Sequence, residues 1–154
     1  MIETINSFVS RFGTSIRLDK NSLLKKQNRY FLVDENLKRL VSKDFFHAGI
    51  YLGKTENGEF IPSSGLLQMV AEGKANKVVV DEKTEWLFIC GRDIFRQGVI
   101  RVQGSRRKGD YTLVLNRHRE CLGFGKILFD LSEEREGVVI GNILDIGDFL
   151  RRER

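Results

Sequence analysis

The chain has 154 residues, of which 41% are hydrophobic and 31% charged, with one proline and 15 glycines. This composition is typical of a packed globular protein of one domain or two small ones, and it excludes a disordered or fibrous chain. No apolar run approaches the roughly 18 residues of a membrane span and the N-terminus has no signal-peptide layout, so we expect a soluble, cytoplasmic protein without a membrane partner.

The first half of the chain carries the signals of a small α/β unit. Its predicted elements are a helix over residues 2–12 that Gly13 ends, a strand over 30–33, a helix over 35–41 capped by Asp34, a hairpin over 50–61, and a helix from Ser63 or Ser64 to Gly73. The hairpin has the strongest local signal, because Asn57-Gly58 tolerates the positive φ angles of a type I′ turn. Residues 1–75 are therefore predicted to form two or three helices on a short, mostly antiparallel sheet.

After Asn76 the chain becomes rich in strands. Apolar runs bounded by glycines and charges predict strands over residues 78–80, 99–102, 111–115, 122–131 and 138–143, with a short helix around Trp86–Ile89. Several short strands at this spacing are typical of a closed or half-closed barrel. The predicted fold class is α+β, with an N-terminal α/β domain over residues 1–75 followed by a β-barrel domain over residues 77–154.

No arrangement of side chains in the sequence indicates catalysis or a metal site. Cys90 and Cys121 lie in apolar strings without metal-ligand spacing, and we interpret both as buried, reduced thiols. His47 and His118 are isolated histidines, and no phosphate-binding P-loop is present. We therefore expect a non-catalytic protein with no metal and no cofactor.

The stretch LGFGKILF, residues 122–129, partly matches the signature of an RNA-recognition motif. Leu122 replaces the basic residue of that signature and Lys126 replaces a base-stacking aromatic, so the two positions most concerned with nucleic acid are lost. We interpret Gly123 and Gly125 instead as positions of close backbone approach within the barrel.

The basic residues favour an anionic partner, and their identity differs between the two halves. The net charge is +5, and 11 of the 15 basic residues after Asn76 are arginines, against 4 of 11 up to that residue. Arginine offers a planar fork of donors to phosphates and a flat face to bases. The second half is therefore the better candidate for contact with nucleic acid.

The order of motifs resembles that of a known family. The stretch WLFICGRDIFRQGVIRV, residues 86–102, resembles the start of a PUA domain, the small β-barrel module of many proteins that modify RNA or assemble ribosomes. With LGFGKILFDL after it and DIGDFLRRER at the C-terminus, the chain is similar over nearly its full length to the ribosome-biogenesis factors of the Nip-seven type. In those proteins a pre-PUA domain precedes the PUA domain, and the compact loops of this chain resemble the archaeal members.

The resemblance implies a non-catalytic RNA-binding protein that acts in assembly of the large ribosomal subunit and in processing of its RNA. The implied partners are rRNA or pre-rRNA, bound where it is single-stranded and uridine-rich, and other ribosome-assembly proteins; we expect a monomer. Two other interpretations stay open. One is a protein-docking adaptor built on a PUA-like barrel, and the other is an accessory subunit of an RNA-modifying enzyme.

The predicted RNA-binding residues surround a loop bracketed by glycines and would converge on one groove if the barrel closes as in the PUA family. They are Gly91, Arg92, Arg96 and Gly98 of the loop, Arg101 on the next strand, and Arg151 and Arg152 after the last element. We expect Ile146, Phe149 and Leu150 to anchor the tail and to leave its arginines free. A glycine-flanked turn presents the secondary candidates Arg106, Arg107 and Lys108, whose alternative interpretation is a solvated hairpin tip.

Overall fold

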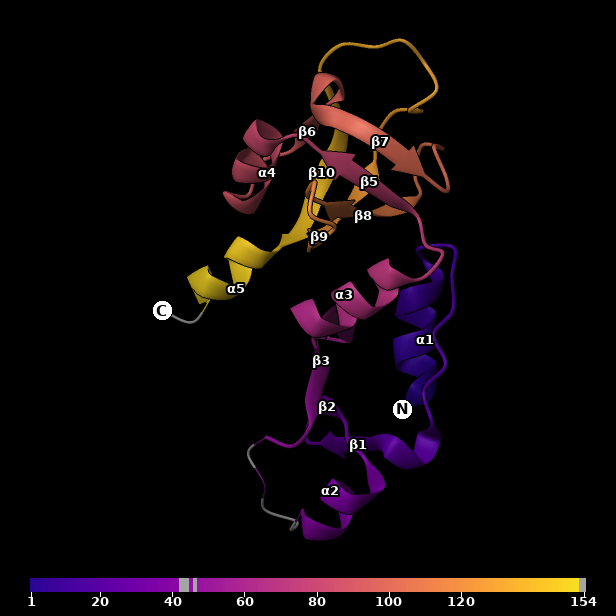
Figure 1. The fold of residues 1–154 in the computed structure, drawn as a ribbon, viewed down its shortest axis with the longest axis vertical. Coiled ribbons are helices and arrows are strands. Elements are labelled where there is room, and N and C mark those ends of the chain that lie inside the picture. Colours follow the sequence, from indigo (N-terminus) through magenta and orange to yellow (C-terminus); the bar gives the residue numbers. More distant parts are fainter. Residues whose placement is uncertain (42–44, 46, 153–154) are drawn as a thin grey trace.

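The computed structural model describes residues 1–41, 45 and 47–152, which form two sheets with flanking helices (Figure 1). The helices are α1 (Ile2–Ser10), α2 (Glu35–Leu40), α3 (Ser64–Glu72), α4 (Glu82–Ile89) and α5 (Ile146–Arg152), with 3-10 turns η1 (Lys20–Ser22) and η2 (Arg96–Gly98). The strands are β1 (Leu23–Lys26), β2 (Arg29–Leu32), β3 (Ile50–Glu56), β4 (Glu59–Pro62), β5 (Lys77–Val80), β6 (Ile94–Phe95), β7 (Val99–Gln103), β8 (Tyr111–Leu115), β9 (Cys121–Ile127) and β10 (Val138–Asp145). No helix among these residues is both long enough and apolar enough to cross a membrane.

The N-terminal sheet joins β1, β2, β3 and β4 in chain order, with antiparallel neighbours. Its hairpin turn has φ angles of 51° at Asn57 and 81° at Gly58, which confirms the predicted type I′ geometry. The predicted helix caps are also confirmed. The Asp34 carboxylate accepts a 2.7 Å hydrogen bond from the Leu37 amide, and the Ser63 hydroxyl accepts one of 3.1 Å from the Leu66 amide.

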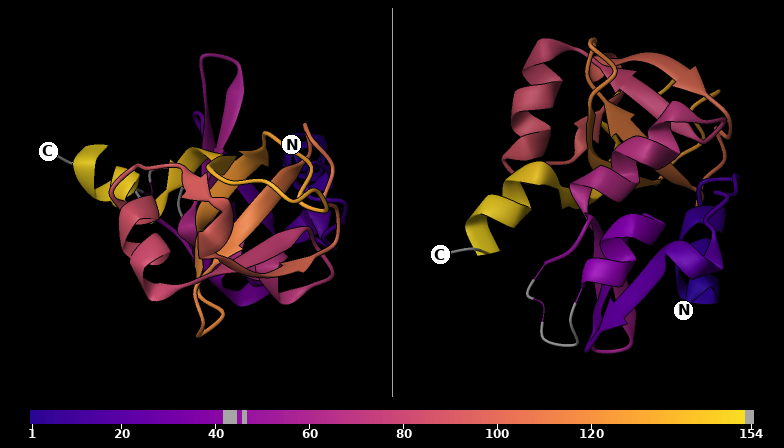
Figure 2. Two further views of the ribbon diagram at one scale, coloured as in Figure 1. Left: turned by 90° about the horizontal axis from the view of Figure 1, so that it is seen from above. Right: turned by 60° about the horizontal axis from the view of Figure 1, so that its bottom comes forward.

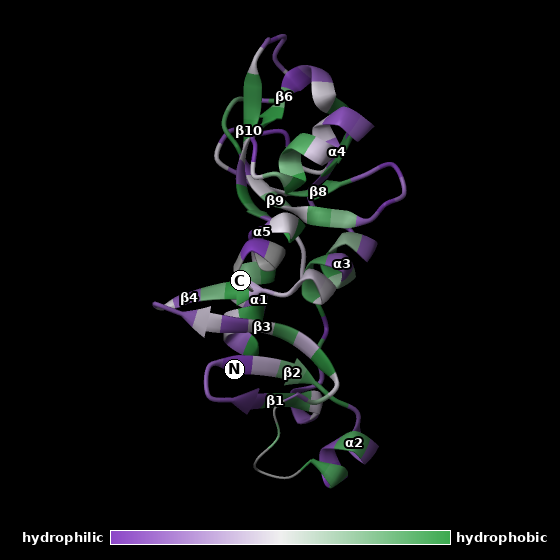
Figure 3. Ribbon diagram, turned by 90° about the vertical axis from the view of Figure 1, so that its left-hand side faces the viewer, coloured by the Kyte–Doolittle hydropathy of each residue, from purple (hydrophilic) through white to green (hydrophobic). Residues whose placement is uncertain are grey.

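The C-terminal sheet has six strands in the order β6-β10-β9-β8-β5-β7 and curls into a half-barrel (Figure 2). β5 and β8 run parallel, while the other neighbouring strands are antiparallel. Val78, Val80, Val114 and Ile140 are among the side chains that fill its interior, and α4 packs against it through Phe88. In Figure 3 the apolar colour follows β8 and β10 through the half-barrel, while α4 carries both polar and apolar residues. The predicted α+β class is confirmed.

Two glycines of β9 lie where the neighbouring strand β10 crosses closely. A Cβ at Gly123 would lie 1.9 Å from the Leu144 carbonyl oxygen, and one at Gly125 would lie 2.5 Å from that of Gly141. Real side chains do not fit at such distances, so the interpretation of both glycines as sites of close backbone approach is confirmed.

One hydrophobic core joins the N-terminal elements to the half-barrel. α1 and α3 lie between the four-stranded sheet and the half-barrel (Figures 1 and 2). The rings of Phe8 on α1 and of Phe12 in the turn after it meet the Phe124 ring of β9, with centroids 5.6 and 5.4 Å apart. Leu113 and Leu115 of β8 belong to the same buried cluster. The apolar contacts therefore cross the boundary predicted at residues 75–77.

Asn76, at that boundary, is hydrogen-bonded to both sides. Its amide donates to the Phe12 carbonyl at 2.8 Å and its carbonyl accepts from the Leu113 amide at 2.9 Å. Its side chain donates to the Tyr111 carbonyl at 3.2 Å and accepts from the Ser105 amide at 2.9 Å. The connection between the two sheets is therefore packed and bonded along its length.

Several details differ from the sequence expectations. The first helix ends at Ser10, ahead of Gly13, and the short elements β1, β6 and α5 were not predicted. Cys90 is exposed, so the expectation that both thiols are buried is wrong for Cys90 and confirmed for Cys121. Ile146 packs against the half-barrel core as expected, whereas the side chains of Phe149 and Leu150 lie outside the described part of the chain.

Candidate nucleic-acid interface

The predicted glycine loop is an ordered connection held against β10. Asn142 of β10 donates through its side-chain nitrogen to the carbonyls of Phe88 and Arg92, at 2.9 and 3.3 Å, and its amide donates to the Asp93 carboxylate at 2.8 Å. Gly91 has a φ of 91°, a left-handed conformation that favours glycine, and both Gly91 and Arg92 are exposed. The first part of the loop is therefore open to a partner.

The second part of the loop is closed by packing. Gly98 is buried, and a Cβ there would lie 2.0 Å from the Thr84 hydroxyl of α4. The expectation that Gly98 exposes bare backbone to a partner is therefore wrong, because the space is filled by Thr84. Arg96 is half-buried and lines a surface hollow with Ser132, Arg135 and three acidic residues, Glu133, Glu134 and Glu136.

Arg151 of α5 is engaged within the protein. Its guanidinium donates to both carboxylate oxygens of Asp145, each at 3.2 Å, and to the Ile89 carbonyl at the end of α4 at 3.1 Å. The expectation of a free guanidinium at Arg151 is therefore wrong, because the only buried aspartate in the described chain pairs with it. The Arg152 side chain lies outside the described part of the chain.

The turn between β7 and β8 exposes all three secondary candidates, Arg106, Arg107 and Lys108. Arg107 lies 3.7 Å from Asp110, and Lys108 lies 6.0 Å from the centre of the Phe129 ring. The guanidinium of Arg135, which the sequence interpretation did not single out, lies 3.4 Å from the centre of the same ring. This turn is a separate basic surface, away from the hollow described next.

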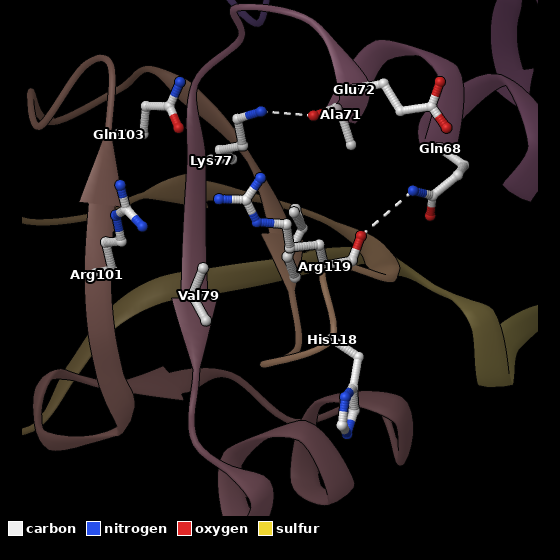
Figure 4. Close-up of a pocket in the computed structure, with 10 residues that line it drawn as sticks. Gln68, Ala71, Glu72, Lys77, Val79, Arg101, Gln103, His118 and Arg119 are labelled. Atoms are coloured by element: carbon white, nitrogen blue, oxygen red, sulfur yellow. Dashed lines mark hydrogen bonds between the residues drawn. The ribbon is translucent and has the colours of Figure 1, made fainter.

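Arg101 lies in another group of basic residues, where a hollow of about 380 Å³ opens between α3 and the outer face of the half-barrel. We call it the junction hollow. It is lined by Gln68, Ala71 and Glu72 of α3, Lys77 and Val79 of β5, Arg101 and Gln103 of β7, Leu115 of β8, and His118 and Arg119 of the turn between β8 and β9. Figure 4 shows Lys77, Arg101 and Arg119 approaching this space from three segments.

Strand register explains why these side chains meet. Val79 pairs with Arg101 across β5 and β7, and Lys77 pairs with Gln103, so all four lie on one face of the sheet. The intervening Val78 and Val80 point into the barrel and are fully buried. The alternation along β5 therefore places a basic residue and an apolar residue outside while it fills the core with valines.

Hydrogen bonds fix the walls of the junction hollow. Lys77 donates to the carbonyls of Ala71 and Gly73 at the end of α3; burial lowers the pKa of Lys77, and the charge of Arg119 lowers it further. The Gln68 side chain donates to the Arg119 carbonyl at 3.3 Å and accepts from the Cys121 amide at 2.8 Å. α3 and the turn are thereby held together.

The sequence interpretation missed Lys77, His118 and Arg119 as parts of one site. The run RHR over residues 117–119, between two predicted strands, is a basic turn that could have been singled out. Its position beside Arg101 in one hollow could not, because that position depends on the pairing of β5 with both β7 and β8. No group of three or more metal-ligating side chains occurs among the described residues.

The arrangement suits the binding of anions. Within the described chain, the guanidinium groups of Arg92, Arg101 and Arg119 have no carboxylate within ion-pair distance, and all three are exposed. The predicted residues are thus divided among the loop, the junction hollow, the β7–β8 turn and α5. Among the hollows of the described residues given above, none is lined by all of them.

Comparison with known proteins identifies the half-barrel. The model of the UPF0113 PUA domain matches residues 76–154. A UPF0113 protein of Archaeoglobus fulgidus is 26% identical over 163 residues, covering 99% of this chain and 91% of the relative. A tRNA-guanine(15) transglycosylase of Methanosphaera stadtmanae is 26% identical over 121 residues, covering 79% of this chain and 16% of that enzyme. A conserved PUA domain protein of Thermoplasma acidophilum superposes with a TM-score of 0.62 at 23% identity, covering 97% and 91% of the two chains.

Proposed function

Since the chain belongs to the UPF0113 PUA domain family, we propose that it is a non-catalytic RNA-binding protein that acts in the cytoplasm in assembly of the large ribosomal subunit and processing of its RNA. PUA domains bind RNA. The observation that supports this function best is the set of exposed arginines on the half-barrel, Arg92, Arg101, Arg106 and Arg119, which contact no carboxylate in the described chain. Guanidinium groups left free in this way are available to phosphate oxygens.

We propose single-stranded RNA as the ligand. The basic residues of the half-barrel lie in separate segments, the glycine loop, the junction hollow and the β7–β8 turn, whereas a duplex presents a continuous, regularly spaced phosphate surface. A single strand can bend between such surfaces and can turn its bases toward the protein. The preference for uridine-rich sequence and the role in ribosome assembly rest on the resemblance to the Nip-seven type.

A second candidate function is supported by the similarity to the tRNA-guanine(15) transglycosylase, 16% of which is covered by this chain. A segment like this chain therefore occurs within a much larger enzyme. By analogy, the protein would act as an accessory subunit that delivers RNA to a separate modifying enzyme. A third candidate function is that of a protein-docking adaptor, for which contact with RNA would be incidental.

Crosslinking of the tagged protein in living cells, followed by sequencing of the attached RNA, tests the proposal. We expect reads from large-subunit rRNA and its precursors. Enrichment of tRNA with a co-purified modifying enzyme would favour the accessory subunit. Recovery of protein partners without RNA above the level of an untagged strain would favour the adaptor.

A further inference from the structure

We propose that the junction hollow binds one nucleotide of a single-stranded RNA, with its phosphate between the guanidinium groups of Arg101 and Arg119. This inference rests on the proposed function, because it names a place on the protein where RNA docks. The hollow lies between α3 and the half-barrel, apart from the glycine loop and α5. It is therefore a contact additional to the loop surface predicted from the sequence.

Charge is the first argument for an anionic group in the hollow. Lys77, Arg101 and Arg119 line it from three different segments, with Glu72 as the one acidic side chain among the lining residues (Figure 4). The Lys77 ammonium is already hydrogen-bonded to two carbonyls at the end of α3. The two arginines have no carboxylate partner in the described structure, and two guanidinium forks can share the oxygens of one phosphate.

The volume and the lining residues of the junction hollow indicate which part of the ligand lies beside the phosphate. A volume of about 380 Å³ lies at the lower end of small-ligand pockets and suits a single nucleotide. Val79 gives the hollow a half-buried apolar wall next to the buried Leu115, while the exposed Gln103 and His118, which also line it, carry no side-chain hydrogen bond in the described chain. An amide can pair with the edge of a base and an imidazole can stack on its face, as in other single-strand binding sites.

The alternative ligand is an acidic peptide, which the same cations would attract. A carboxylate would use the arginines but would leave the apolar side chain of Val79 and the amide of Gln103 without a matching group. The phosphate of a nucleotide matches the arginines, and its base matches the apolar and amide side chains of the hollow, so we favour RNA as the ligand.

The test compares two double variants that remove the same charge. Arg101→Gln with Arg119→Gln alters the hollow, and Arg106→Gln with Arg107→Gln alters the β7–β8 turn. Each is titrated with a fluorescein-labelled ten-residue oligouridylate at two salt concentrations, after thermal melts show that both variants are folded. We expect the hollow variant to lose about tenfold in affinity and to flatten the salt slope by about one phosphate, with a smaller loss for the turn variant.

Crosslinking separates failure of the hollow from failure of RNA binding. An oligouridylate with 4-thiouridine is irradiated on the wild-type chain, and we expect crosslinked peptides from residues 68–79 and 115–121. Crosslinks confined to residues 90–98 and 146–152, or an unchanged affinity of the hollow variant, would overturn the hollow and leave the proposed function intact. A wild-type chain that binds no oligouridylate would overturn both. Amide NMR shifts at Val79 and Arg119 with hexaglutamate, and none with RNA, would assign the hollow to an acidic peptide.

Discussion

Arg151 is paired with Asp145, a carboxylate whose side chain is only 3% exposed, through two hydrogen bonds of 3.2 Å from one nitrogen of the guanidinium. The same carboxylate accepts from the Asp148 amide, so it caps the start of α5 while it holds the arginine near the end of that helix. Gly147 allows this approach, since a Cβ there would lie 2.0 Å from the Ile89 carbonyl oxygen. A basic tail that looks suited to RNA therefore has a structural role at its first arginine.

The first prediction concerns that ion pair. Arg151→Ala should lower the free energy of unfolding by about 1 to 2 kcal/mol, because it leaves a buried carboxylate with fewer donors; the half-exposed arginine keeps the loss below that of a fully buried pair. Urea denaturation measures it. Arg92→Ala is the matched control, since that side chain is exposed, and its effect should stay within about 0.5 kcal/mol. Equal midpoints for the two variants would show that the pair contributes nothing to stability.

The second prediction concerns Gly98. Gly98→Ala should destabilise the protein by about 1 to 3 kcal/mol, because the new methyl group overlaps Thr84 and α4 must shift. Gly65→Ala in α3 is the control, since its Cβ would meet ordinary contacts of 3.6 Å and more. That change should be neutral or stabilising by up to about 1 kcal/mol. Thermal melts of both variants decide whether Gly98 serves packing, and an unchanged melting temperature for Gly98→Ala would contradict it.

The third prediction concerns pH and the cap of α4. The Asp81 carboxylate accepts a 2.8 Å hydrogen bond from the Thr84 amide, and its hydrogen bonds to the Thr84 side chain and backbone lower its pKa from the ordinary value of 3.8. Its contribution to stability is then complete above the ordinary value and is lost as the pH falls through the lower, folded value. Asp81→Ala should lower the free energy of unfolding by about 1 kcal/mol at neutral pH, and by less at acidic pH. Ser63→Ala is the control, because it removes a helix cap that does not titrate. If the loss of unfolding free energy declined with pH equally in both variants, the pH dependence would not come from the Asp81 carboxylate.

The fourth prediction concerns the two thiols. Burial raises the pKa of Cys121 to about 11, whereas Cys90 is exposed. The thiolate is the reactive form, so an aromatic disulfide reagent near pH 8 should modify one thiol quickly in the native protein and the other only after denaturation. Cys90→Ser should abolish the fast reaction. Rapid modification of both thiols in the native wild-type chain would show that the core around Cys121 opens readily.

The fifth prediction concerns the domain boundary, which we still propose near Asn76. A fragment of residues 77–154 should form the half-barrel but melt well below the full chain, because Leu113, Leu115 and Phe124 lose the cover of α1 and α3. It should also bind a hydrophobic dye more strongly than the full chain does. Circular dichroism and dye fluorescence measure both. A fragment as stable as the full chain would show that the shared core is not needed by the half-barrel.

Local signals predicted the parts of the fold that depend on neighbouring residues. The caps at Asp34 and Ser63 and the Asn57-Gly58 turn are set within three or four residues, and the structure confirms each. Elements of few residues, such as the two-residue strand β6, have too little periodicity to detect. The α5 helix contains Gly147 and only seven residues, so propensity alone does not reveal it.

The site was less predictable because it is made by contacts between distant segments. Gly98 has the appearance of a flexible loop glycine until Thr84, fourteen positions earlier, is placed against it. Arg151 and Asp145 are six positions apart, yet their pairing depends on where α5 meets α4. Composition located the arginines in the second half, whereas only the sheet register brought Arg101 to Lys77 and Arg119.

Asn76 is hydrogen-bonded to Phe12 after α1, to β8 and to the β7–β8 turn, so the connection between the two sheets is fastened on both sides. The glycine loop and most of the lining of the junction hollow belong to the same half-barrel, whose neighbouring strands are hydrogen-bonded, so the fold sets the distance between them. An RNA strand that engages both must bridge that interval with a matching number of nucleotides. If RNA binds at both places as proposed, strands that are too short reach only one of the two, and the affinity then depends on the length of the strand.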